Sequence, residues 1–368
     1  MTSALVLLIV VMLVVLVFEY INGFHDTANA IATVVSTKVL TPRQALLLAS
    51  STNLIGAFCG QAVAKTMHSG LIDDKVVAVT TLTILAAMLG GIVWNLLTWW
   101  FGMPSSSTHA LVGGLIGAAM ASSPTAWNWG VLIWSRAKID SKTGLPTSDM
   151  EGIFHKVVIP MISSPLLGLT IGFTVMGLLF ILIRNWRPHT VNTVFGRLQI
   201  VSAAYMGFGH GMADAQKTMG IIMLTLFAST KAGELDGLPA WLHFLQVPDK
   251  NASIPTWIIV TCALTMAAGT YAGGWRIIKT LGHKMVKMKP VHGFAAETTA
   301  ATILAVTGAM GMPVSTTHTI TTSIMGVGAA RRWNAIEWSL VERIVWAWVM
   351  TIPATATLGY VFYKIIAS

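Results

Sequence analysis

One stretch of this sequence occurs twice, as Gly102-Met103-Pro104-Ser105-Ser106-Ser107-Thr108-His109 and as Gly311-Met312-Pro313-Val314-Ser315-Thr316-Thr317-His318. Each copy follows a long apolar run and precedes a Gly- and Ala-rich one. Proline presets a first helical turn, Ser and Thr cap unpaired N–H groups, and the helix dipole favours an anion there. The repeated stretch therefore predicts two helix N-termini that can hold an anion. An alternative stays open, in which these small hydroxyl residues only let helices pack closely in lipid.

The composition is that of a membrane protein that crosses the bilayer several times. Hydrophobic residues make up 54% of the 368 residues and charged residues only 10%, whereas soluble domains are about a quarter charged. The first apolar run, from Ala4, lacks the basic start and the cleavage pattern of a signal peptide, so we interpret it as a retained span. The net charge of +9 comes from basic residues dispersed in short loops, which argues against nucleic-acid binding.

The expected spans form two matching sets. The first set is 3–22 continuing into 26–37, then 43–67, 75–101 and a short helix 105–121. The second set is 198–209 continuing into 213–228, then 255–276, 291–311, a short helix 314–329 and a final span 342–366. A polar stretch 122–155 and a span 157–183 lie between them. The predicted divisions are a first repeat 1–121, a connecting segment 122–197 with one transmembrane span, and a second repeat 198–368 that includes the final span.

Loop charge predicts that the two sets have opposite orientations. Cytoplasmic loops carry an excess of Lys and Arg. In the second set the loop 276–289 is basic and the loop 231–253 carries acids, whereas in the first set the order is reversed, with a basic loop 38–43 and two aspartates in 69–75. We therefore predict an all-α membrane protein with two inverted-topology repeats, broken helices and re-entrant hairpins, which is the usual construction of a secondary transporter.

Each set also contains ionisable residues in the middle of its first, overlong apolar element. They lie in Asn22-Gly23-Phe24-His25-Asp26-Thr27-Ala28-Asn29-Ala30 and in Gly207-Phe208-Gly209-His210-Gly211-Met212-Ala213-Asp214-Ala215-Gln216-Lys217. An Asp near the bilayer centre costs roughly 2.5 to 3.5 kcal/mol, so it persists only if it is paired, solvated or used. The glycines predict a helix break that frees carbonyl groups for a cation. In the alternative, Asp214 only neutralises Lys217 and the asparagines only join helices.

Four further polar residues are weaker candidates. Glu297 lies early in a span and is either a proton carrier or a solvated residue near the cytoplasmic end. His109 and His318 follow the hydroxyl runs and bond either a phosphoryl oxygen or a backbone carbonyl. Asn53 lies at mid-span depth and can contribute to either cluster.

With these motifs the chain resembles the inorganic phosphate transporter (PiT) family, in particular its bacterial low-affinity phosphate permease branch. The resemblance implies a symporter of the bacterial inner membrane that imports inorganic phosphate together with a cation. It implies phosphate contacts from the hydroxyl runs, and we add the neighbouring pair Gln216 and Lys217; the phosphate set is Ser105, Ser106, Ser107, Thr108, Ser315, Thr316, Thr317, Gln216 and Lys217. The expected coupling residues are Asn22, His25, Asp26, Asn29 and Asp214, with sodium at Asp26, Asn29 and Asp214 if sodium is the coupling ion.

Two departures from the family pattern favour protons over sodium as the coupling cation. Ala213 stands where the family usually has Asn, and Lys217 stands where many sodium-coupled members have a second Asn. A sulfate permease of the same architecture is the alternative, and a passive anion channel is a third reading. We expect no enzyme and no cofactor, because no metal-ligand spacing such as H-E-x-x-H exists and adjacent helical residues such as His25 and Asp26 point apart. Transport of a metal–phosphate complex and a homodimeric state stay open.

Overall fold

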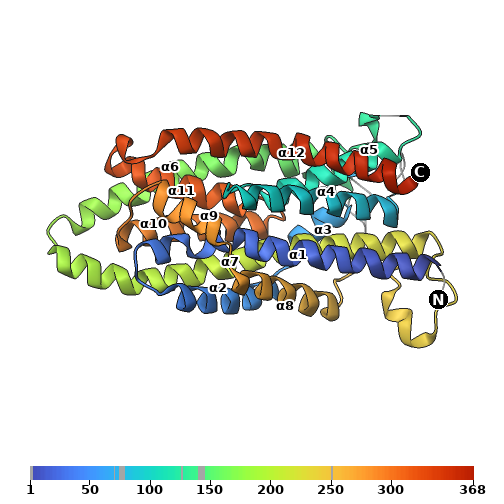
Figure 1. The fold of residues 1–368 in the computed structure, drawn as a ribbon, viewed down its shortest axis with the longest axis horizontal. Helices are drawn as coiled ribbons and strands as arrows, with labels where there is room; N and C mark the ends of the chain where they lie inside the picture. Colours follow the sequence, from blue (N-terminus) through green and yellow to red (C-terminus); the bar gives the residue numbers. More distant parts are fainter. Residues whose placement is uncertain (1–2, 70, 74–78, 126, 140–145, 250–251) are drawn as a thin grey trace.

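The chain folds into an elongated bundle of helices (Figure 1). The computed structural model describes residues 3–69, 71–73, 79–125, 127–139, 146–249 and 252–368. In this part of the chain the α-helices are α1 (Ser3–Ser36), α2 (Pro42–Ala57), α3 (Ala62–Ser69), α4 (Thr81–Trp100), α5 (Ser107–Ser122), α6 (Ile159–Ile183), α7 (Pro188–Lys231), α8 (Thr256–Ala272), α9 (Trp275–Lys279), α10 (Pro290–Ala309), α11 (Thr316–Arg331) and α12 (Trp338–Ala367). Short 3-10 turns are η1 (Trp129–Val131), η3 (Ala240–Leu245) and η5 (Trp333–Ala335), and π-helical turns are η2 (Phe154–Val158) and η4 (Thr280–Lys284).

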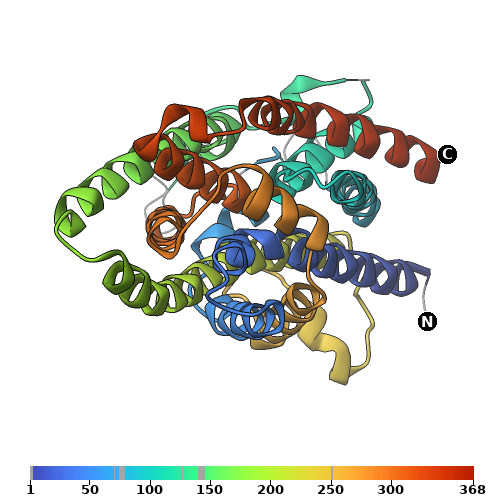
Figure 2. The ribbon, with the colours of Figure 1, turned by 60° about the vertical axis from the view of Figure 1, so that its left-hand side comes forward.

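Among the described residues, four helices are long and apolar enough to cross a bilayer, which confirms the prediction of a multi-pass membrane protein. They are Ala4–Ser36, Thr81–Trp100, Phe154–Ile183 and Trp338–Ala367, and the bent pair Thr256–Ala272 with Trp275–Lys284 also qualifies as one span. The helices α6 and α12 lie on one long side of the bundle, and α2 and α8 lie on the opposite side (Figures 1 and 2). Much of the surface of α6 and α12 is exposed Leu, Ile, Val and Trp, as expected where helices face lipid.

The breaks predicted in the two overlong elements are wrong. Helix α1 runs without interruption from Ser3 to Ser36, and α7 runs from Pro188, inside the segment predicted to connect the repeats, to Lys231. The glycines serve close packing instead: a Cβ at Gly23 would lie 2.5 Å from the carbonyl oxygen of Met266, and a Cβ at Gly211 would lie 2.2 Å from that of Asn53. Small residues at these places let α1 approach α8 and let α7 approach α2.

The second helix of each set is the one that is interrupted. The span predicted over 43–67 is divided into α2 and α3 at Gly60, whose φ is +87°, and the span predicted over 255–276 is followed at Gly273, with φ +75°, by α9. Glycine adopts this backbone region without the steric cost that other residues have. The axis bends by 57° between α8 and the segment Trp275–Lys284.

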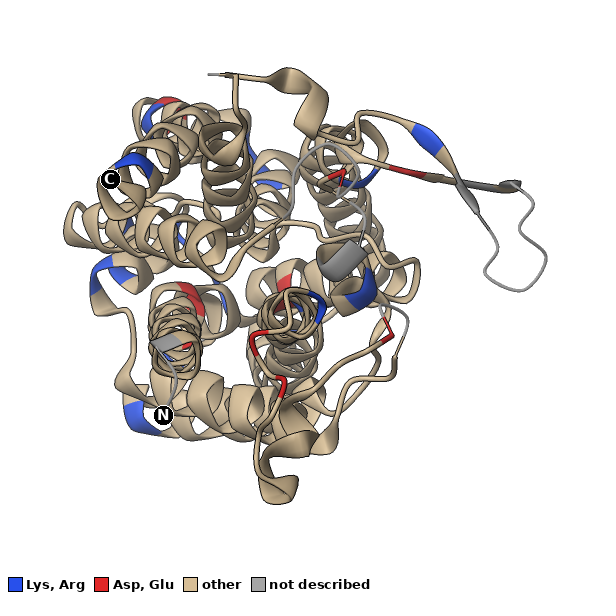
Figure 3. Ribbon diagram, turned by 90° about the vertical axis from the view of Figure 1, so that its right-hand side faces the viewer, with Lys and Arg blue, Asp and Glu red and all other residues tan. Residues whose placement is uncertain are grey.

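The connecting segment contains the one departure from an all-α fold that the described residues show. A two-stranded antiparallel hairpin forms from β1 (Arg136–Ile139) and β2 (Pro146–Glu151), with Arg136 opposite Glu151. Arg136 also forms ion pairs with Glu151 and, at 3.6 Å, with Asp73. Figure 3, viewed along the bundle, shows this hairpin projecting beyond the helices and shows that most of the ribbon carries no charge. Residues 74–78, which belong to the acidic loop and the predicted start of span 75–101, lie outside the described residues.

Two helical hairpins, α4–α5 and α10–α11, have the same turn. At each turn a glycine follows the helix C-cap in the left-handed region, Gly102 with φ +65° and Gly311 with φ +66°. The next amide, of Met103 or Met312, donates to the carbonyl of Thr98 at 2.8 Å or of Thr307 at 2.9 Å. This is the Schellman closure of a helix C-terminus. The repeated sequence therefore folds the same way twice.

Candidate functional site

The hydroxyl stretches form two equivalent helix N-termini, as predicted. Ser106 is the N-cap of α5 and accepts a hydrogen bond from the amide of His109 at 3.1 Å, and Ser315 is the N-cap of α11 and accepts one from the amide of His318 at 3.2 Å. The first amides of an α-helix have no intrahelical acceptor. Those of Ser107, Thr108, Thr316 and Thr317 are therefore available to a ligand at the two tips.

The two tips contact each other near the middle of the bundle. Thr108 of α5 donates to the carbonyl oxygen of Val314, which precedes α11, at 3.5 Å. The rings of His109 and His318 meet edge to face with centroids 4.8 Å apart, and His318 also stacks on Trp348 at 3.9 Å. Neither histidine shows the backbone-carbonyl bond considered from the sequence among the contacts of the described residues. The positive ends of two helix dipoles are thus directed toward one region.

Each hairpin turn is held by the interrupted helix of the opposite set. Thr66 of α3 donates to the carbonyl oxygen of Gly311 at 2.8 Å, and Thr280 of η4 donates to the carbonyl oxygen of Gly102 at 2.8 Å. These two bonds are equivalent in the two sets. The interrupted helix of each set therefore helps to fix the position at which the short helix of the other set, α5 or α11, begins. The site consequently depends on both halves of the chain.

Helix α1 presents Asp26 and Asn29 to the two tips. The Oδ2 atom of Asp26 accepts a hydrogen bond from Ser107 at 2.6 Å, and its Oδ1 atom accepts one from Thr317 at 3.3 Å. The Nδ2 atom of Asn29 lies 3.2 Å from Thr316 Oγ1 and 2.9 Å from Thr317 Oγ1. The other amide atom of Asn29, Oδ1, is buried without a partner among the described residues. An acceptor oxygen therefore remains available beside Asp26.

Helix α7 presents Asp214 on the facing side. Its Oδ2 atom accepts a hydrogen bond from Thr316 at 3.0 Å and lies 3.1 Å from Nε2 of His210, while its Oδ1 atom contacts the ammonium group of Lys217. Asn53 of α2 positions the imidazole, since its Oδ1 atom lies 3.3 Å from Nδ1 of His210. The ion pair that the sequence offered as the alternative for Asp214 and Lys217 is thus formed.

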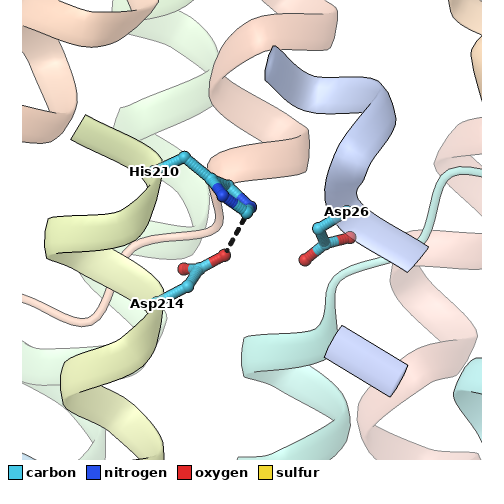
Figure 4. A group of neighbouring side chains, drawn as sticks. All are labelled: Asp26, His210 and Asp214. Atoms are coloured by element: carbon cyan, nitrogen blue, oxygen red, sulfur yellow. Dashed lines mark ion pairs between the residues drawn. The ribbon is translucent and has the colours of Figure 1, made fainter. Parts of the chain in front are cut away.

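The two acidic clusters form one group. One ligand atom from each of Asp26, His210 and Asp214 lies within 4.8 Å of the other two, and all three side chains are buried. Figure 4 shows Asp26 on one helix directed toward His210 and Asp214 on the other. Two carboxylates this close repel each other unless a cation or a proton lies between or beside them. The arrangement is therefore suited to bind cations next to the helix tips.

Three residues lie in surroundings other than those that the sequence suggested. His25 and Asp26 do not point apart, because Nδ1 of His25 lies 2.7 Å from Oδ1 of Asp26. The Nε2 atom of His25 lies 3.1 Å from Oγ1 of Thr98 on α4, and this contact holds the imidazole in place. Gln216 holds the turn between α2 and α3, where its amide bonds the backbone of Val63 and Cys59 at 3.0 and 3.1 Å.

Asn22 is the third residue. Its Nδ2 atom lies 3.5 Å from Glu19, and no contact to the tips or to the acidic group is seen for it within the described residues. Ser105 joins the group indirectly, since its Oγ atom donates to Thr98 at 2.8 Å and lies 3.5 Å from His25.

The site is closed in this structure. Every predicted phosphate or cation residue is at most 4% exposed. The hydroxyls of Ser107, Thr316 and Thr317 donate to the carboxylates of Asp26 and Asp214. An arriving anion has to replace these acceptors.

Two glutamates are buried among the membrane helices. Glu297, for which solvation was one alternative, is fully buried and accepts hydrogen bonds from Thr33, Ser202 and Gln199, so that alternative is wrong. Glu19 was missed: it is 0% exposed and accepts a hydrogen bond from Thr218, which follows Lys217. The signal that could have found it is a single carboxylate within an otherwise apolar run near the N-terminus, which is costly in a bilayer.

Comparison with known proteins places the chain in a family. Residues 22–359 match the model of the phosphate transporter family. A protein of Bacillus subtilis named a probable low-affinity inorganic phosphate transporter is 39% identical over 366 residues, covering 100% of this chain and 99% of the relative. One of Rhizobium meliloti with the same name is 42% identical over 368 residues, covering 98% and 97%.

A solved structure described as the sodium-dependent phosphate transporter has the same fold, with a TM-score of 0.77 at 21% identity, covering 98% of this chain and 99% of that one. The relatives are named as transporters, which agrees with the expectation that the chain is not an enzyme. The chain therefore belongs to the phosphate transporter family.

Proposed function

We propose that this protein is a secondary symporter that imports inorganic phosphate together with a cation, with protons favoured over sodium, and that phosphate binds between the N-termini of α5 and α11. The single observation that carries this proposal is the meeting of two identically capped helix tips beside the paired acids Asp26 and Asp214. The names of the relatives support phosphate as the substrate, and nothing in them supports the sulfate alternative.

The chemistry of the tips suits a tetrahedral oxyanion. The first-turn backbone amides of α5 and α11, which have no intrahelical acceptor, supply donors with a favourable dipole. The hydroxyls of Ser107, Thr108, Thr316 and Thr317 supply further donors when they rotate from their present acceptors toward the anion. Ser106 and Ser315 each accept one amide bond and keep an O–H to donate. Such charge-assisted hydrogen bonds are worth about 1.5 to 3 kcal/mol each.

Coupling follows from the charge next to the tips. Asp26 and Asp214 have ligand atoms within 4.8 Å of each other, and an anion that takes hydroxyl donors away from them leaves their charge less well compensated. Phosphate therefore binds favourably only when a cation arrives with it. This requirement makes the movement of the anion depend on the cation gradient.

Two cations, sodium and the proton, are candidates for the coupling ion. Asp26, Asn29 and Asp214 offer the oxygen ligands that sodium takes, and Oδ1 of Asn29 has no other partner among the described residues. Protons are favoured because an imidazole lies beside each acid, His25 at 2.7 Å from Asp26 and His210 at 3.1 Å from Asp214. An imidazole nitrogen in such a contact can donate or accept a proton beside the carboxylate.

A metal–phosphate complex is a second form of the substrate that one observation favours. Two carboxylates and one imidazole within 4.8 Å of one another form a set that a divalent cation can bind. The metal would then travel as part of the cargo, bound to phosphate on one side and to Asp26, His210 and Asp214 on the other.

Alternating exposure of the site is proposed to come from the two sets of helices acting as inverted repeats. The equivalent turns, caps and reciprocal bonds of Thr66 and Thr280 support this relation. Rocking of one repeat against the other exposes a site at their interface to either side. Glu297, buried and bonded to Thr33 of α1, is proposed as a second proton-binding residue in this movement.

Uptake of labelled phosphate into proteoliposomes tests the proposal. Accumulation is expected when a proton gradient is imposed and is expected to be weaker with a sodium gradient. Excess unlabelled sulfate should not compete. Stimulation by Mg²⁺, with co-accumulation of the metal, would identify the metal–phosphate form. Equilibration without accumulation under both gradients would contradict the symporter and leave a passive channel, and competition by sulfate would contradict the assigned substrate.

A further inference from the structure

The first set of helices, here called the first half, and the second set, the second half, differ in the residue that stands three positions after each acid. Asn29 follows Asp26 by three residues on α1, and Lys217 follows Asp214 by three residues on α7. Both side chains lie on the same face of their helix as the acid. Both also reach the hydroxyls of a helix tip: Asn29 contacts Thr316 and Thr317, and Lys217 contacts Thr108. An amide in one half thus takes the place of an ammonium group in the other.

The ammonium group of Lys217 has no donor left for phosphate. Its Nζ atom contacts Oδ1 of Asp214, Oγ1 of Thr108 and, at 3.1 Å, the carbonyl oxygen of Val314. A lysine ammonium has three N–H groups, and these three oxygens account for all of them. This arrangement argues against the expectation that Lys217 holds the substrate directly.

The ligands around Nζ are those of a small cation. A carboxylate, a hydroxyl and a backbone carbonyl converge on one point, and hard cations such as sodium take oxygen ligands of these kinds. Among the Lys and Arg side chains that the structure describes, Lys217 is the only one that is buried, at 3% exposure. Burying an ammonium group is costly unless an acid pairs with it, so its position beside Asp214 is a specific feature of this site.

In the first half, no Lys or Arg side chain among the described residues forms an ion pair with Asp26. Asp26 contacts the neutral donors Ser107 and Thr317 and the imidazole of His25. The nearby Oδ1 atom of Asn29 is unpartnered among the described residues. The first half therefore offers an acid and a free amide oxygen, whereas in the second half a carboxylate, a hydroxyl and a carbonyl oxygen already surround a positive charge.

We propose that the ammonium group of Lys217 is a tethered cation that permanently fills one of two equivalent cation positions, the one at Asp214. The protein then takes up one coupling cation fewer per phosphate than it would if both positions were open to ions. The coupling cation that it does take up binds at Asp26 and Asn29. This inference rests on the proposed cation-coupled transport of phosphate. It assigns Lys217 as the residue that sets the number of coupling cations, not as a phosphate ligand.

The test replaces Lys217 by the residue that the first half uses. In proteoliposomes, phosphate–phosphate exchange is measured against sodium concentration at constant ionic strength for the wild type, Lys217→Asn, Lys217→Gln and Lys217→Met. In Lys217→Asn and Lys217→Gln, exchange is expected to require sodium or lithium, with a Hill coefficient for that cation higher by about one than in the wild type. In Lys217→Met, which offers no oxygen, exchange is expected to be lost at every sodium concentration. Sodium-dependent thermal stabilisation of purified Lys217→Asn is an independent readout.

The outcomes separate the two proposals. If the wild type shows no phosphate exchange, the proposed function fails and not this inference alone. If the wild type exchanges phosphate and Lys217→Met keeps wild-type exchange, the tethered cation is refuted. Active Lys217→Asn with wild-type sodium dependence also refutes it. If all three variants lose the folded protein in detergent, Lys217 is a structural ion-pair partner and the inference is overturned.

Discussion

Replacing Asp26 by Asn isolates the charge that we assign to cation binding. The amide keeps the size of the side chain and can still accept a hydrogen bond from Ser107, so packing in α1 is retained. A cation bound at Asp26 and Asn29 lies closer to the carboxylate that is lost than 4.8 Å, the distance within which the ligand atoms of Asp26, His210 and Asp214 lie from one another. At 4.8 Å and an effective dielectric constant of about 20, two unit charges interact by about 3.5 kcal/mol. This is a loss of roughly 300-fold or more in cation affinity.

The assay is labelled phosphate uptake into proteoliposomes, with the coupling cation varied over several decades. Asp26→Asn is expected to lose gradient-driven accumulation and to shift the half-saturating cation concentration by at least this factor. Asp236→Asn is the matched control, since Asp236 is an exposed acid in the loop after α7, and it should behave as the wild type. Folding of both variants is checked by size-exclusion chromatography and thermal melting. A shift of less than about tenfold in a folded Asp26→Asn protein, near 1.4 kcal/mol, would refute the assignment.

Three further measurements test the phosphate site, the role of Gln216 and the predicted orientation of the chain. Ser107→Ala and Thr316→Ala should each weaken apparent phosphate affinity roughly tenfold to a hundredfold, the loss of one hydrogen bond to a charged ligand; unchanged half-saturation of exchange in both would move the site elsewhere. Gln216→Ala should lower stability by about 1 to 3 kcal/mol, because it leaves buried backbone groups unpaired, yet leave phosphate affinity unchanged; weaker affinity at equal stability would return Gln216 to the site. Single cysteines at Asp249 and Lys287, in a cysteine-free background, should label from outside intact cells and only after permeabilisation, respectively; the reverse pattern would contradict the predicted orientation.

The sequence by itself determined the class of protein and the chemistry of its centre. Membrane spans are visible because apolar length is a local property of the chain. The N-termini of α5 and α11 were predicted because Pro, Gly and Ser act on the backbone next to them, and Ser106 and Ser315 cap these helices at equivalent positions. Asp26 and Asp214 were identified because a carboxylate within a bilayer is energetically costly and therefore indicates a functional or paired group.

Which groups touch was decided only by the tertiary structure. The sequence predicts helix breaks at Gly23 and Gly211, but both glycines are close packing contacts with α8 and α2, respectively. The sequence alone does not predict these contacts, because the partner helices are remote in the chain. Gln216 and Lys217 are adjacent in sequence and were expected to act together, but one holds a turn and the other pairs with Asp214.

Glu297 is another residue whose surroundings the sequence alone does not predict. Its burial depends on donors from α1 and α7 that arrive only when the bundle forms. Local sequence patterns determine where helices begin and end and which charged side chains are present. The partner that each polar group finds is set by helix packing across more than a hundred residues of chain, for example between Lys217 and Thr108, which are 109 residues apart.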